Sequence, residues 1–494
     1  MAEEDDRPDE RTAWAEALRG FIGDTRANSG RIMQSYVLSP LAAFRKFLIC
    51  LAVAGAVAWL PDWPGLEPAA QRSLFVLILA AALWISEAIP AYAVSVLVIA
   101  LQIALLGQPG GVFSEGPDDW EIFIRPWADP LLWLFFGGFV MGAGAVKTGL
   151  DRQVAVRVLT RIPPRPGWIL FAVMGITMMF SMFMSNTATS VMMVAVLGPL
   201  LVSFAKEDPF GRGLLLGVAF AASLGGMGSI IGSPPNAIAA GALGRDTITF
   251  ATWMGAGLPV ALVLAGIIWT YLWLRYPSQQ LRIDFEPLRR AAAEKADVPA
   301  WHLVFVVIVF IVTIGLWLTS ALHGIPSTVV SFLPITAFSV GRILEASDVR
   351  KLPWDILLLL AGGLSLGVGI RETGLAGWIV DLVPLGQLPA LGVALVFAYL
   401  ALWLSNFMSN TAAANILVPV AITFAAAEGG GQTLLVVPIA LAASAAMLLP
   451  ISTPPNAIVY GQGRHSMKDF TVVGVMMGLI APPLVVLWCW WYFL

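Results

Sequence analysis

The chain has 494 residues, of which 58% are apolar and 12% are charged, and its formal net charge is −3. Because soluble domains carry roughly 25% charged residues, this composition excludes an ordinary soluble domain. Apolar runs recur at about the 17–25 residues that a helix needs to cross a bilayer. We therefore predict an all-α polytopic protein of the plasma (cell inner) membrane, with membrane lipid and no nucleic acid among its partners.

Residues 1–43 begin with a cluster of charged side chains and lack the apolar core of a signal peptide. We predict that they form a cytoplasmic N-terminal tail. After this tail, the apolar runs predict about eleven transmembrane helices and two re-entrant helical hairpins. The predicted transmembrane helices are residues 44–62, 72–89, 91–107, 131–150, 213–245, 251–274, 301–321, 327–342, 354–375, 433–460 and 470–494.

Lys and Arg residues set the predicted orientation, because they accumulate in cytoplasmic loops. Three segments are basic, at 147–165, 206–212 and 275–295. The apolar run between the first two, 167–205, has basic residues on both sides. We therefore expect it to enter and leave the membrane from the cytoplasm, as a hairpin.

The second half of the chain shows the opposite charge pattern. No Lys or Arg lies between Arg371 and Arg464, so we expect the equivalent hairpin, 388–427, to enter from outside, and the C-terminus to be external. The two halves then form an inverted repeat of five spans and one hairpin. Matching glycine motifs support this repeat, namely Gly137-Gly138 with Thr148–Leu150, and Gly362-Gly363 with Thr373–Leu375.

One eight-residue phrase occurs twice, as Ser181–Ala188 and Ser405–Ala412, and the two copies differ at one position. Each copy is followed by a second shared motif, Ser233–Ile238 in the first half and Thr453–Ile458 in the second. Polar, helix-breaking elements at corresponding places in two apolar halves indicate the binding site of a transporter.

The chemistry of these motifs suits both a cation and an anion. Each Pro-Pro pair interrupts a helix, and the carbonyls freed near Gly232 and Ser452 are hard oxygen ligands for a small cation. The helix that follows each break presents N–H groups and a positive dipole end to an anion. The amides of Asn186 and Asn410 offer an oxygen to a cation and an NH₂ group to an anion. The alternative interpretation is structural, since a lone Ser-Asn-Thr usually caps a helix and a lone Pro-Pro usually makes a kink.

On these motifs the chain resembles a known family, the divalent anion/sodium symporters (DASS), which carry Ser-Asn-Thr at each hairpin tip and a (Ser/Thr)-Pro-Pro-Asn-Ala break. Trp84–Pro90 and Leu134–Phe139 also resemble family segments. The resemblance covers nearly the whole chain, and it implies a homodimer in which a transport domain moves as an elevator against a scaffold. It divides the chain into a tail (1–43), scaffold helices 1–4 with a basic interfacial segment (44–166), a first transport half (167–274), a cytoplasmic linker (275–300), scaffold helices 7–9 (301–375) and a second transport half (388–494). The first transport half consists of hairpin 167–205, broken helix 213–245 and helix 251–274. The second consists of hairpin 388–427, broken helix 433–460 and helix 470–494.

The resemblance also implies which residues bind each ligand. The implied substrate-binding residues are Asn186, Thr187, Ser233, Asn410, Thr411 and Thr453. The implied sodium ligands are Ser181, Ser185, Asn186 and the carbonyl of Gly232 at one site, and Ser405, Met408, Asn410 and the carbonyl of Ser452 at another.

The activity implied is secondary active transport of di- or tricarboxylate anions such as succinate, malate, fumarate or citrate, with Na⁺ as the coupling ion and no cofactor. Neither tip has a Lys or Arg near it in sequence, so bound Na⁺ would offset the anion's charge, which is costly to bury. Some relatives exchange anions without sodium. A sodium-independent exchanger and a transporter of sulfate or another divalent anion therefore remain alternatives.

Other classes of protein fit the sequence less well. An intramembrane enzyme is disfavoured because the chain has three scattered histidines and no His-Glu-x-x-His motif. A proton-driven antiporter normally needs a carboxylate in mid-membrane, whereas the candidate acidic residues fall near span ends. These residues are Glu87, Asp129, Asp355 and Glu372. A channel is a third possibility, which saturable countertransport would exclude.

Overall fold

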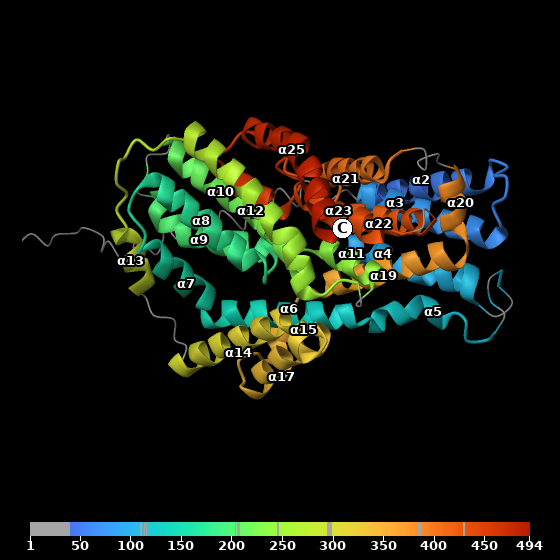
Figure 1. The fold of residues 1–494 in the computed structure, drawn as a ribbon, viewed down its shortest axis with the longest axis horizontal. Helices are drawn as coiled ribbons and strands as arrows, with labels where there is room; N and C mark the ends of the chain where they lie inside the picture. Colours follow the sequence, from blue (N-terminus) through green and yellow to red (C-terminus); the bar gives the residue numbers. More distant parts are fainter. Residues whose placement is uncertain are drawn as a thin grey trace, which may run out of the picture.

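The computed structural model describes residues 40–108, 111–112, 114, 116–202, 204, 208–244, 247–293, 299–382, 388–427 and 430–494, so almost all of the predicted N-terminal tail lies outside the described residues. Within this described part the chain is helical and has no β-strand (Figure 1). Nine of the described helices are long and apolar enough to cross a membrane. The prediction of an all-α, multi-pass membrane protein is therefore confirmed.

Most of the predicted spans coincide with helices of spanning length. The remaining two segments of that length are α21 (Ala390–Phe407), which belongs to a predicted hairpin, and Pro209–Gly228, which belongs to a predicted broken helix and consists of α10 (Pro209–Gly225) and the 3₁₀ turn η3 (Gly226–Gly228). Length alone therefore does not distinguish a crossing from one arm of a hairpin. The spans that coincide are α2 (Pro40–Trp59), α3 (Pro68–Ser86), α6 (Pro130–Thr148), α12 (Phe250–Arg275), α14 (Ala300–Leu318), α19 (Trp354–Glu372) and α25 (Met467–Phe493).

Besides the two predicted broken helices, 213–245 and 433–460, two predicted spans are built from shorter pieces. Residues 91–107 form α4 (Ala91–Gln102), which continues as a π-helical turn, η1 (Ile103–Gly107). Residues 327–342 form α16 (Ser327–Val330) and α17 (Phe332–Val340). The interruption follows from Pro334, which has no N–H to donate to the carbonyl four residues earlier. Short helices also lie outside the predicted spans or at their ends, namely α5 (Glu121–Ile124), η2 (Arg125–Ala128), α7 (Leu150–Leu159), α13 (Glu286–Ala293), α15 (Ser320–His323), α18 (Ala346–Val349) and α20 (Leu375–Leu382).

Helices α6 and α19 end in the same way. Thr148 and Thr373 each donate their hydroxyl hydrogen to the carbonyl four residues earlier, at 2.7 Å in both helices. Gly149 (φ +67°) and Gly374 (φ +73°) then adopt the left-handed conformation that glycine tolerates best. The chain turns at each glycine and continues into α7 or α20, so the repeated Thr-Gly-Leu motif makes one structure twice.

The repeated glycine pairs allow close helix packing. A Cβ atom at Gly137 of α6 would overlap Ser331, and one at Gly362 of α19 would overlap Ser95 of α4. Consequently α6 packs against α16 and α17, and α19 packs against α4. The two contacts occupy equivalent places in the repeat.

Each half contains the same series of helices, which is a pair joined by a short tip, a helix that breaks, and a long helix. In both series the broken helix packs on the first arm of the pair, as α10 on α8 and α23 on α21. The first series is α8 (Pro166–Ser181), α9 (Asn186–Val202), α10, α11 (Pro234–Leu243) and α12, and the second is α21, α22 (Asn410–Ala427), α23 (Gln432–Ser444), α24 (Pro454–Tyr460) and α25.

The two series also pack against each other. The piece after the first break, α11, contacts α22 and α23, while the piece after the second break, α24, contacts α9 and α10. In Figure 1 the pair α8/α9 lies towards the end that carries α13, and α21/α22 lies towards the opposite end, which carries α20. The two pairs therefore approach the middle of the molecule from opposite ends.

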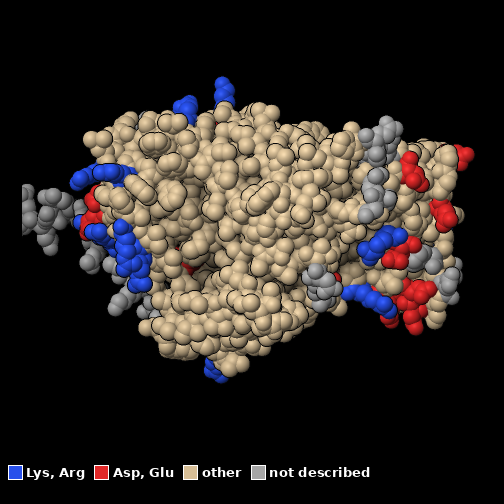
Figure 2. Space-filling model, viewed as in Figure 1, with Lys and Arg blue, Asp and Glu red and all other residues tan. Residues whose placement is uncertain are grey.

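Charged side chains are concentrated at these two ends. Figure 2 shows Lys and Arg gathered around the end that carries α13, and most of the Asp and Glu at the end that carries α5 and α20. The face between them is almost free of charge in this view. This distribution matches a membrane-spanning body with a basic end and an acidic end.

Candidate functional site

The repeated Ser-Asn-Thr motifs form the tips of the two helix pairs. The hydroxyl of Ser185 accepts a hydrogen bond from the N–H of Ala188 at 3.2 Å, and the hydroxyl of Ser409 accepts one from Ala412 at 3.2 Å. Each serine thus caps a helix, as the structural interpretation of the motif predicts. Since α9 and α22 begin at these tips, the free N–H groups of their first turns favour a negative charge there.

A group of oxygens converges beside the first tip. The Ser181 hydroxyl donates to the carbonyl of Ala222 at 2.6 Å. One terminal atom of the Asn186 amide lies 2.5 Å from Ser181 Oγ, 3.1 Å from the Ala222 carbonyl and 3.2 Å from the Gly232 carbonyl. If this atom is the nitrogen, it donates to these oxygens. If it is the oxygen, four oxygens face one another, which is the donor set of a small hard cation such as Na⁺.

Side chains satisfy the backbone freed at the first break, between α10 and α11. The Asn236 amide donates to the carbonyls of Gly226 and Ser229 at 2.8 and 2.7 Å, and the Trp253 indole donates to Met227 at 3.2 Å. Non-helical backbone at membrane depth needs such partners, because lipid offers none. These hydrogen bonds therefore stabilise the break in a conformation that directs the Gly232 carbonyl at Asn186.

The second tip is joined to its break through Asn406. Its side-chain oxygen accepts from the N–H of Leu448 at 2.9 Å, and its amide donates to Leu402 at 3.0 Å. The Ser452 hydroxyl donates to the backbone carbonyl of Asn406 at 3.1 Å. In the first half Ser229 makes the equivalent bond to the carbonyl of Met182. In each half, a serine from the break therefore bonds to the backbone carbonyl of the second residue of the repeated phrase.

Several buried oxygens near the tips and breaks have no hydrogen-bond partner among the described residues. They are Ser405 Oγ and Asn410 Oδ1 at the second tip, and Asn236 Oδ1 and Asn456 Oδ1 after the breaks. Leaving a polar atom buried and unpaired costs about 1–3 kcal/mol. Because all four atoms can accept, they fit a bound cation or a donor from a ligand, and the residues present fit Na⁺.

The structure treats the predicted sodium ligands differently in the two halves. It brings Ser181, Asn186 and the Gly232 carbonyl into one cluster, whereas Ser185 is engaged in its cap. In the second half the Ser452 hydroxyl bonds to Asn406. Ser405 and Met408, which are close to Asn406 in sequence, are both buried, and Asn410 is the first residue of α22.

The predicted substrate-binding residues also differ in exposure. Ser233 is buried and makes no capping bond with its side chain, whereas the Thr453 hydroxyl accepts from Asn456 N at 3.3 Å as the cap of α24. Thr187 is exposed and Thr411 is buried. The hydrogen-bond partners that we find for the tips and breaks are hydroxyls, amides, an indole and backbone groups, all uncharged.

Sequence reasoning did not identify four groups that complete these clusters. They are the Ala222 carbonyl, Ser229, the amide of Asn236 with its counterpart Asn456, and Asn406. A signal was available for two of them. Asn236 and Asn456 lie within the repeated Pro-Pro motif, and Asn406 is the one position at which the eight-residue phrases differ.

The amino-acid sequence is similar to a known family and to named relatives. The family model described as "Sodium:sulfate symporter transmembrane region" matches residues 41–494. The sodium-dependent dicarboxylate transporter SdcS of Staphylococcus saprophyticus is 31% identical over 457 residues, which cover 84% of this chain and 85% of the relative. The transporter of the same name from Staphylococcus aureus strain USA300 is 30% identical over 444 residues, 82% of each chain.

Two solved structures share the fold at low sequence identity. MtrF of Neisseria gonorrhoeae, from a class of antimetabolite efflux pumps, aligns with a TM-score of 0.55 at 13% identity and covers 82% of this chain and 96% of its own. The YdaH transporter of Alcanivorax borkumensis aligns with a TM-score of 0.53 at 14% identity and covers 80% and 96%. At these identities the likeness concerns the fold alone.

Proposed function

We propose that this chain, which belongs to the sodium:sulfate symporter transmembrane family and is therefore a membrane transporter and not an enzyme, carries di- or tricarboxylate anions across the plasma membrane together with Na⁺. The observation that carries the proposal is the polar cluster in which the Asn186 amide meets the Ser181 hydroxyl and the carbonyls of Ala222 and Gly232. Two relatives of about 30% identity that are named sodium-dependent dicarboxylate transporters support it.

In this proposal Na⁺ binds where oxygens converge or lack partners. One ion is held by Ser181, Asn186 and the Gly232 carbonyl, with Ser185 beside them. A second is held by Ser405, Met408, Asn410 and the Ser452 carbonyl. The ions supply positive charge to a site whose own groups are neutral, and they fix the orientation of both tip amides.

The anion binds between the two tips. Its carboxylates take hydrogen bonds from the amides of Asn186 and Asn410 and from the hydroxyls of Thr187, Thr411 and Ser233, with Thr453 at the end of the second break. The first-turn N–H groups of α9 and α22 add a favourable dipole. Ordering of both tips by Na⁺ before the anion arrives would couple the two ligands.

The proposed orientation follows the charge distribution. The basic end with α13 faces the cytoplasm and the acidic end with α5 and α20 faces outside. The pair α8/α9 then enters from the cytoplasm and α21/α22 from outside, as two re-entrant hairpins, and the C-terminus is external. We propose further that the two transport halves move together as an elevator against the scaffold helices, in a homodimer.

Uptake into proteoliposomes tests the proposal. Labelled succinate, citrate and sulfate are supplied with an inward Na⁺ gradient or with choline, and with or without internal succinate. We expect succinate uptake that requires Na⁺ and no internal anion. Uptake of sulfate alone would assign another substrate class, and uptake that requires internal succinate in choline would assign an exchanger.

A further inference from the structure

A long groove lies on the outer surface of the first transport half, between α8 and α12. It has a volume of about 970 Å³. Apolar side chains line it, and four of them, Trp168, Phe171, Leu262 and Trp273, are 47–56% exposed. Both helices are in the apolar body of the protein, so the groove opens towards lipid.

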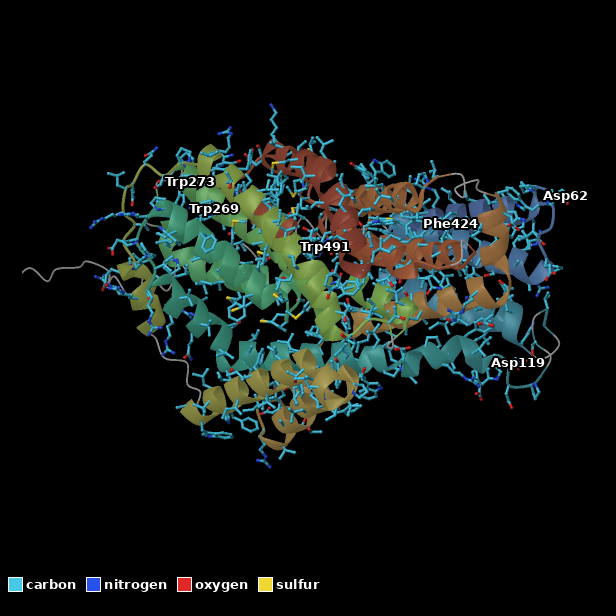
Figure 3. The ribbon with its side chains drawn as sticks, viewed as in Figure 1. Asp62, Asp119, Trp269, Trp273, Phe424 and Trp491 are labelled. Carbon is cyan, nitrogen blue, oxygen red and sulfur yellow. The ribbon has the colours of Figure 1, made fainter. Side chains whose placement is uncertain are left out.

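Aromatic contacts make this groove a fixed structure. Trp269 and Trp273 stack in parallel, with ring centroids 5.5 Å apart and an interplanar angle of 11°. The Trp269 indole donates to the carbonyl of Gly167 at 3.2 Å, and the Phe171 ring lies edge-on to Trp269 at 6.2 Å. These contacts tie α12 to α8. Figure 3 shows Trp269 and Trp273 on the part of α12 that lies towards the basic end of the molecule.

Two arginines close the basic end of the groove. Arg165 directly precedes α8, and Arg282 follows the end of α12. The N–H of Ile283 donates to the carbonyl of Pro164 at 3.0 Å, which holds the two segments together. Both arginines are exposed, and neither forms an ion pair within the part of the chain that the structure describes. Guanidinium groups in this setting suit a phosphate.

The length of the groove fits one leaflet of a bilayer. Its lining extends along α12 from Leu262 to Trp273 and along α8 from Pro166 to Met178. At a rise of 1.5 Å per residue these stretches are about 17–18 Å long. Half of the hydrocarbon thickness is about 15 Å.

We propose that this groove binds an anionic phospholipid of the leaflet at the basic end. The headgroup phosphate binds Arg165 and Arg282, and an acyl chain lies along the aromatic floor. The tryptophans stand near the interface, where their amphipathic rings are favourable. Because Arg165 begins the first arm of α8/α9 and Arg282 belongs to the link between the halves, one bound lipid joins the two.

Native mass spectrometry and fluorescence test this site in the full-length protein. The protein is titrated in neutral detergent with phosphatidylglycerol or phosphatidylcholine of the same acyl chains. A parallel titration with brominated phosphatidylglycerol measures quenching of tryptophan fluorescence. The Trp269→Phe/Trp273→Phe variant identifies the part of this quenching that comes from the groove. The test variant is Arg165→Gln/Arg282→Gln, and the matched control is Arg289→Gln/Arg290→Gln, which removes the same charge from α13.

We expect phosphatidylglycerol to bind about 10- to 30-fold more tightly than phosphatidylcholine, the order that two arginines near an anionic headgroup supply. The test variant should lose this preference and the control should keep it. Equal binding of both lipids, or a preference that survives in the test variant, would overturn the proposal. A change of oligomeric state in the test variant alone would instead assign the groove to a second copy of the chain. The readout is independent of transport.

Discussion

The side-chain amide of Asn186 lies 3.2 Å from the carbonyl oxygen of Gly232. Asn186 begins α9, and Gly232 ends η4 (Ile230–Gly232), the second of two 3₁₀ turns between α10 and α11, so the contact joins a tip to a break. Ser452 and Asn406 make the corresponding connection in the second half. In each half, two interruptions of helical structure support each other, which explains why their motifs recur in the same order along the chain.

Replacing either tip asparagine should nearly abolish transport. Asn186→Ala and Asn410→Ala each remove the hydrogen bonds that we propose to the bound anion, and bonds to a charged group are worth about 1.5–3 kcal/mol, or roughly 10- to 150-fold in affinity. Initial rates of succinate uptake in proteoliposomes measure the effect. Gln462→Ala, which removes an amide beyond the end of α24, is the control. Uptake near the parent rate in either tip variant would exclude a site built from both tips.

The two serines that precede the tips should behave differently in thermal unfolding. Ser181→Ala removes a bond to the Ala222 carbonyl, which keeps the N–H of Gly226 as a donor, so we expect a loss of about 0.5–1.5 kcal/mol without any ligand. The Ser405 hydroxyl is buried without a partner among the described residues, so Ser405→Ala should be neutral or stabilising in choline. Both variants should lose most of the rise in Tm that Na⁺ gives the parent protein. A full Na⁺ response in Ser405→Ala would remove Ser405 from the sodium site.

Asn406→Met makes the two repeated phrases identical and should destabilise the protein. The substitution leaves the N–H of Leu448 without its acceptor in a partly buried place, which costs about 1 kcal/mol or more. Chemical or thermal unfolding in the same detergent measures the loss, with Met182→Leu as the control in the first half. If Asn406→Met were as stable as its parent, the connection between second tip and second break would not depend on this side chain.

The sequence predicted the helical class and the repeat because both depend on local patterns, such as apolar runs and the recurring glycine and Pro-Pro motifs. It did not predict the role of Asn406, because the partner of that side chain, Leu448, is distant in sequence and close only in the fold. The capping role of Ser185 and its sodium role were both compatible with the sequence. The geometry shows the cap. The division of 327–342 into two helices depends on Pro334, whose effect the hydropathy of the run conceals.

Cysteine labelling tests the proposed entry of the two helix pairs. Asp208, beside the first pair, is buried as the cap of α10 and is a poor probe. We therefore choose Cys at Arg165 and Lys206 for the first pair, and Cys at Leu388 and Gly430 for the second. In a Cys50→Ser/Cys489→Ala background, the first two should react only with reagent from the cytoplasm. The second two should react only from outside. If the two flanks of one pair reacted from different sides, that pair would cross the membrane.

The central claim is that Na⁺ and a dicarboxylate occupy one site formed by both tips. The most direct test measures the affinity for succinate across a Na⁺ series balanced with choline, and the affinity for Na⁺ with and without succinate, on the purified protein in nanodiscs. We predict that each ligand tightens the other by the same factor, for which coupling of about 1–3 kcal/mol, or 5- to 150-fold, is typical. Succinate binding that is equal in choline and in sodium, with Na⁺ affinity unchanged by succinate, would contradict the account.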